Sequence, residues 1–151
     1  MTRTLVPIIS AVLVALFVYT AVSKLLDLDS FRENLYNQPF PLWVGGLLAW
    51  LIPSAELLTV VLLVTPPLRI WGFLAAFSLM LAFTIYVALV YGNAFGRVPC
   101  SCGGVIESMS WGAHLLFNVV FTIISFAGLT LEHRHWLQLH QPEKISSRRP
   151  V

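Results

Sequence analysis

Residues 70–91 read IWGFLAAFSLMLAFTIYVALVY, a run without one charged side chain. A helix needs about 20 mostly apolar residues to cross the hydrocarbon core of a bilayer, and this run is long enough. Gly92 and Asn93 follow it and favour a helix end. Because a lone helix satisfies its own backbone hydrogen bonds in lipid, whereas a β-barrel would need short alternating strands that the chain lacks, the run predicts a membrane-spanning helix.

Three further apolar runs have a similar length, at about residues 6–23, 42–65 and 111–131. The whole chain has 151 residues, 58% hydrophobic and 11% charged. Soluble domains carry about a quarter charged residues, so this composition excludes a soluble protein. The first run is too long, and lacks a small-residue cleavage site, for a removable signal peptide. The fold class expected is an all-α membrane protein, a four-helix transmembrane bundle over residues 1–131, with a polar tail at 132–151.

The segment between the first two spans, residues 24–41, alternates charged and apolar side chains. Its apolar members recur at helical spacing and are Leu25, Leu26, Leu28, Phe31 and Leu35. Such spacing predicts a short amphipathic helix that lies on the membrane surface.

The distribution of Lys and Arg predicts the orientation, because these residues are more frequent on the cytoplasmic side of the spans. One side has six of them, Arg3, Arg69, Arg134, Lys144, Arg148 and Arg149. The opposite side has three, Lys24, Arg32 and Arg97, and leaving out the two most distant tail arginines still gives four against three. We therefore expect a multi-pass protein of the bacterial inner membrane with both termini in the cytoplasm and residues 92–110 facing the periplasm.

The connection at 92–110 contains the only two cysteines of the chain, in the stretch PCSCGG at residues 99–104. Cys100 and Cys102 are close enough along the chain to form a disulfide, and the small ring would be strained and therefore labile. Arg97 and the start of the fourth predicted helix add positive potential, which favours the thiolate. Since disulfides persist in oxidising compartments such as the periplasm, the pair predicts thiol–disulfide exchange.

Two other interpretations of the cysteines remain open. They could form a static clip or stay reduced and idle, although a bridge across so small a loop constrains the unfolded chain very little. They could also bind a metal, but two thiols are too few ligands for zinc, and His114 would have to supply a third. We expect no metal, and one cysteine pair cannot form a relay without a partner's thiols or a cofactor.

Polar side chains inside the spans are the other candidates. Glu56 is the one acidic residue well inside a span, so it should point inward, either to handle protons, to pair with a cation such as Lys24, or to make a structural hydrogen bond. His114 and Asn118 are four residues apart and share a helix face. The histidine could act as a base toward a thiol or bond a quinone carbonyl; a polar contact between helices is the alternative. Most large aromatic residues fall near span ends, as in an interfacial belt: Trp43, Trp50, Trp71, Tyr86, Tyr91 and Trp111. A few of them could instead line a pocket for a flat ring.

Several stretches resemble a known family. Residues 20–27 (TAVSKLLD) with Phe31, and 50–57 (WLIPSAEL), resemble the DoxX superfamily of four-helix membrane proteins. PCSCGG at 99–104, with Ser110, Trp111 and Asn118 after it, resembles the MauE branch more narrowly. The resemblance covers roughly residues 6–131. Three positions differ from what members often carry: Ser23 for glycine, Gly103 for an aromatic residue and Phe117 for arginine.

The resemblance implies a periplasm-facing, redox-associated membrane protein. MauE proteins are linked to maturation of methylamine dehydrogenase, which has a disulfide-rich small subunit, alongside a thioredoxin-like partner. The expected partners are then the lipid bilayer, a periplasmic thioredoxin-like or disulfide-containing protein and a membrane complex, and no basic block suggests nucleic acid. Two classes stay open: a thiol–disulfide oxidoreductase, with a quinone as a candidate cofactor, or a non-catalytic membrane subunit or assembly factor. A third class is a small-molecule carrier that uses a cavity at Glu56, although four spans leave little room for alternating access.

Overall fold

A computed structural model describes residues 2–38, 41–94 and 110–140. Its elements are α1 (Thr2–Leu26), α2 (Leu28–Tyr36), α3 (Leu42–Val64), the short 3-10 helix η1 (Pro66–Leu68), α4 (Arg69–Tyr91) and α5 (Trp111–His140). Four helices are long and apolar enough to cross a membrane, and the described residues contain no strand. The prediction of an all-α protein with four spans and a short helix between the first two is confirmed.

The helix ends differ from the predicted spans mainly at the two ends of the chain. α1 already begins at Thr2, and α5 continues to His140, so part of the predicted polar tail is helical. The apolar part of α5 ends near Arg134. The start of α5 agrees with the sequence, because the Ser110 hydroxyl accepts a hydrogen bond from the Ala113 N–H at 3.3 Å and acts as the N-cap.

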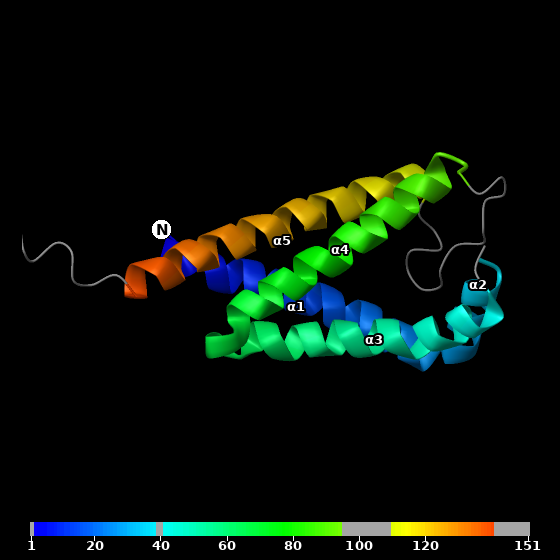
Figure 1. Ribbon diagram of the computed structural model, residues 1–151, viewed down its shortest axis with the longest axis horizontal. Helices are drawn as coiled ribbons and strands as arrows, with labels where there is room; N and C mark the ends of the chain where they lie inside the picture. The colour runs from blue at the N-terminus through cyan, green and yellow to red at the C-terminus, as the bar shows by residue number, and fades with distance from the viewer. Residues whose placement is uncertain (1, 39–40, 95–109, 141–151) are drawn as a thin grey trace, which may run out of the picture.

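The four long helices form two pairs, α1 with α3 and α4 with α5 (Figure 1). The start of α1, η1 and the end of α5 lie at one end of the bundle, which we call the η1 end (Figure 1). The other end, called the α2 end, holds α2, the end of α4 and the start of α5. The two pairs are close together toward the η1 end and diverge toward the α2 end (Figure 1).

The hydrophobic core fills the bundle toward the η1 end. Its buried members come from three helices and are Val6, Leu13, Phe17, Leu63, Phe73, Ala76 and Met80. Gly72 of α4 lies directly on the backbone of α3, since a Cβ there would be 2.7 Å from the Leu63 nitrogen. The Ser10 hydroxyl of α1 donates to the Leu63 carbonyl at 3.1 Å. Small residues thus bring the helix backbones together, as is usual in membranes.

The short helix α2 packs by one face, as its spacing predicts. Phe31 and Leu35 are buried and form a second cluster with Ala49 of α3. Asp27 caps the helix, because its carboxylate accepts from the Ser30 N–H at 3.2 Å. α2 therefore packs against α3 at the α2 end of the bundle. Its contact with a membrane surface stays a prediction.

Candidate functional site

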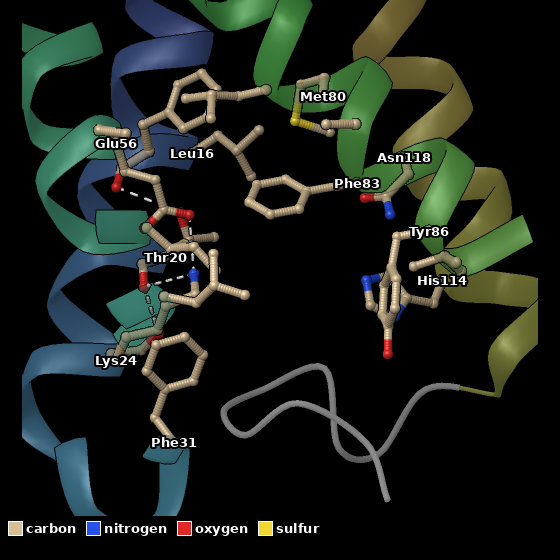
Figure 2. Close-up of a pocket in the computed structure, with 18 of the residues that line it drawn as sticks. Leu16, Thr20, Lys24, Phe31, Glu56, Met80, Phe83, Tyr86, His114 and Asn118 are labelled. Atoms are coloured by element: carbon tan, nitrogen blue, oxygen red, sulfur yellow. Dashed lines mark hydrogen bonds and ion pairs between the residues drawn. The ribbon is translucent and has the colours of Figure 1, made fainter. Parts of the chain in front are cut away.

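A cavity of about 590 Å³ lies between the two helix pairs in the half of the bundle toward α2. Phe17 and Met80 belong both to the core and to the cavity lining, so the cavity begins where the core ends. Its wall is mostly apolar, and its size is in the range of small-molecule sites. Side chains of α1, α2 and α3 form one wall, and those of α4 and α5 form the other (Figure 2).

An ion pair lies on the first wall. The Lys24 ammonium donates to Glu56 Oε1 at 2.9 Å and to the Thr20 carbonyl at 3.1 Å (Figure 2). The ammonium is also 5.9 Å from the centre of the Phe31 ring, within cation–π range. Both side chains are largely withdrawn from solvent, 15% exposed for Lys24 and 2% for Glu56. Of the roles that the sequence leaves open for Glu56, the pairing with Lys24 is present, and Glu56 points inward as expected.

The second carboxylate oxygen of Glu56 has no partner among the described residues. Oε2 is buried and accepts no hydrogen bond, although Glu56 lines the cavity. Buried polar atoms are almost always satisfied, so an unpartnered carboxylate oxygen inside an apolar bundle is costly. It is an acceptor that the fold leaves available.

His114 and Asn118 lie together on the second wall, on one face of α5 (Figure 2). Asn118 is 4% exposed, and its Nδ2 has no hydrogen-bond partner in the part of the chain that the structure describes. Its amide points into the cavity (Figure 2). The His114 ring is half-buried and stacks on Trp111, with ring centroids 6.4 Å apart. The face that the sequence predicts is therefore directed at the same space as Glu56.

Gln38 is a site residue that sequence reasoning missed. The Tyr86 hydroxyl donates to Gln38 Oε1, which ties the chain just after α2 to α4. Of the six aromatic residues near span ends, Tyr86 and Trp111 line the cavity, whereas Trp43, Trp50, Trp71 and Tyr91 are exposed. Nothing in the spacing around Gln38 distinguishes it from a surface glutamine.

Cys100, Cys102 and Arg97 lie outside the described residues. The described chain leaves α4 after Tyr91 and enters α5 at Trp111, and both points are at the α2 end (Figure 1). Trp111 itself lines the cavity. In the parts of the chain that the structure describes, no three His, Cys, Asp or Glu side chains come together as a metal site.

Comparison with known proteins identifies the family. Residues 2–131 match the family described as methylamine utilisation protein MauE. The methylamine utilization protein MauE of Paracoccus denitrificans is 30% identical over 118 residues, an alignment that covers 76% of this chain and 63% of the relative. The chain thus matches less than two thirds of that relative's length. No solved structure matches the chain. Its four spans and the match over nearly all of them mean that the chain belongs to the MauE family of membrane proteins.

Proposed function

We propose that this protein exchanges thiols and disulfides with a partner protein at the membrane face that carries α2, and that Cys100 and Cys102 are the reacting pair. One observation carries the proposal: the segment with both cysteines joins Tyr91 to Trp111, two residues at the α2 end, where the cavity lies. The described part of the bundle supplies a stable anchor for that segment. Such a role fits the maturation of a disulfide-containing protein. The Paracoccus relative is named for methylamine utilization.

The exchange is a two-electron reaction that balances without a further reagent. A partner thiolate attacks the Cys100–Cys102 disulfide, forms a mixed disulfide and releases one cysteine as a thiolate. A second partner thiolate then attacks the mixed disulfide. The partner leaves with a disulfide, and Cys100 and Cys102 have gained two electrons and two protons. The same steps in reverse would reduce the partner, and the reduction potential of the pair sets the direction.

The proposal places the α2 end outside the cytoplasm, in the periplasm of a bacterium. The folded arrangement supports the grouping of charges that the orientation depends on, because the start of α1, η1 and the end of α5 share one end (Figure 1). Lys24, counted with the other side, is bound to Glu56 inside the bundle. It therefore counts for little as a free charge at that membrane face, which increases the imbalance of Lys and Arg.

The test is a single-turnover oxidation of a peptide with two reduced cysteines by the oxidised protein in detergent. We expect one peptide disulfide per protein, measured by mass spectrometry, and none with the Cys100→Ser or Cys102→Ser variant. Each single variant has only one cysteine and cannot form the Cys100–Cys102 disulfide, so the peptide should stay reduced and no mixed disulfide should form. Ser101→Ala is the matched control and should react as the wild type does.

The alternative class makes the opposite prediction. A non-catalytic subunit or assembly factor would tolerate serine at both positions, and its partner would mature at the normal rate. Unchanged partner maturation in cells that carry Cys100→Ser with Cys102→Ser would therefore eliminate thiol–disulfide exchange as the function.

A further inference from the structure

We propose that the cavity between the helix pairs binds a membrane-soluble quinone, with its ring held between Asn118 on one wall and the Lys24–Glu56 pair on the other. This proposal rests on the proposed function, because thiol–disulfide exchange at the cysteine pair creates the need for an electron carrier. The site itself consists only of described residues.

Two unsatisfied polar atoms mark the cavity as a binding site. Among the described residues, Asn118 Nδ2 is a hydrogen-bond donor without an acceptor, and Glu56 Oε2 is an acceptor without a donor. Both residues are buried. They lie on opposite walls, and the rest of the lining is mostly apolar (Figure 2).

The polar pattern selects a class of ligand. A 1,4-quinone has oxygen atoms at opposite ends of a flat apolar ring. One oxygen can accept from the Asn118 amide in both the quinone and the quinol form. At the other end the Lys24 ammonium can donate to a quinone carbonyl, and Glu56 Oε2 can accept from a quinol hydroxyl. The rings of Phe83, Tyr86 and His114 also line the cavity and offer flat faces to such a ring (Figure 2).

A phospholipid acyl chain fits these walls less well. It would occupy the apolar volume but would leave both Asn118 Nδ2 and Glu56 Oε2 without partners, at the full desolvation cost of each group. The ligand must therefore be apolar over most of its surface and polar at two separated points, and a quinone meets both conditions.

The electron balance points to the same class. Oxidation of the Cys100 and Cys102 thiols to a disulfide releases two electrons and two protons. The chain has no other cysteine to receive them. A quinone takes up two electrons and two protons and becomes a quinol, so one quinone per dithiol closes the reaction, and a quinol would drive it in reverse.

The experiment is a binding titration of the purified full-length protein, exchanged into detergent, with the short-tailed quinone ubiquinone-1. Quenching of tryptophan fluorescence is the signal, because Trp111 lines the cavity. The Cys100→Ser/Cys102→Ser double variant should bind as well as the wild type, since the site contains neither cysteine. We expect saturable binding of one quinone per chain.

Asn118→Leu keeps the approximate shape and removes the donor. We expect its dissociation constant to rise roughly tenfold, the equivalent of about 1.4 kcal/mol. Its unfolding temperature should not fall, because the lost N–H has no partner among the residues that the structure describes. Ser125→Ala is the matched control: Ser125 is fully buried on the same helix, bonds the Phe121 carbonyl at 2.8 Å and does not line the cavity. Its affinity for the quinone should not change.

Three results would overturn the quinone site while leaving thiol–disulfide exchange intact: no saturable binding by the wild type, equal affinities of Asn118→Leu and Ser125→Ala, or a copurified phospholipid that the quinone does not displace. The converse result, quinone binding together with full peptide oxidation by the double cysteine variant, would support the site and overturn the proposed function.

Discussion

The Lys24–Glu56 pair shows how an apolar bundle retains a charged residue. A charge inside a membrane span is costly and is usually paired or faces a cavity, and here both conditions hold. Lys24 is close to the end of α1 and sends its ammonium back to the Thr20 carbonyl and to α3. The pair links α1 to α3 through two residues that are 32 positions apart along the chain.

Removal of one partner of the Lys24–Glu56 pair should therefore lower the free energy of unfolding more than removal of both. Lys24→Met leaves Glu56 buried without its cation, and breaking a buried pair in this way typically costs about 3–5 kcal/mol. Adding Glu56→Gln to Lys24→Met should restore a large part of the loss. Thermal unfolding in detergent, followed by tryptophan fluorescence, measures both effects. Arg134→Met, at an exposed position near the end of α5, is the control and should unfold as the wild type does. Additive losses in the double variant would contradict a direct pair.

At the scale of the elements, the close contact between α3 and α4 depends on a missing side chain. A Cβ at Gly72 would be 2.7 Å from the Leu63 nitrogen and 2.9 Å from the Leu62 carbonyl carbon. These are backbone atoms of a packed helix, which cannot rotate away. The apolar run that forms α4 does not reveal from its sequence that its glycine has this role.

Two glycines in spans should thus respond in opposite directions to alanine. Gly72→Ala forces α4 away from α3, and overpacking of this kind typically costs about 1–3 kcal/mol. At Gly46 the nearest atom to an added Cβ is the Tyr36 hydroxyl at 3.5 Å, an ordinary contact. Gly46→Ala should be neutral or stabilise by up to about 1 kcal/mol through helix propensity. Unfolding temperatures of the two variants, compared side by side, decide the matter, and equal values would refute the close contact.

The hydrogen bond from Tyr86 to Gln38 adds a tie from the chain just after α2 to α4. Tyr86→Phe removes the donor, and α2 is then held to the rest of the bundle mainly by Phe31 and Leu35 against α3. We expect faster hydrogen–deuterium exchange in Leu28–Tyr36 and little change in α5. Tyr91→Phe, at a residue that is 61% exposed, is the matched control. Unchanged exchange in α2 would show that the bond does not hold it in place.

At the scale of the whole molecule, the sequence predicts the spans well because lipid imposes a simple rule of length and composition. It also offers Lys24 as one of the possible partners of Glu56, since few ionisable groups inside the spans compete for partners. Polar residues mark where the lipid ends, so the sequence predicts the last span but not the end of its helix, which continues to His140. The cavity could not be predicted, because it depends on how two helix pairs diverge.

The same limit applies to Asn118. Its place on one face with His114 follows from a spacing of four residues, but its unsatisfied amide depends on the distance between the helix pairs. The sequence therefore identifies Glu56 and Asn118 as candidates, and only the packing shows that each directs one atom without a partner among the described residues toward a shared space.

The last prediction concerns the side of the membrane that the cavity faces. The distribution of Lys and Arg predicts that the η1 end lies in the cytoplasm, so Cys100 and Cys102 should react with a membrane-impermeant maleimide in intact spheroplasts after reduction. A cysteine introduced at Pro66, exposed in η1, should react only after the membrane is permeabilised. The two reactions control for leakage and for reagent reach, because η1 lies at the opposite end of the bundle from the end of α4 and the start of α5, which flank the cysteine segment (Figure 1). Labelling of Pro66→Cys in intact cells, with Cys100 and Cys102 protected, would reverse the orientation and would move thiol–disulfide exchange to the reducing side, where a persistent disulfide is rare.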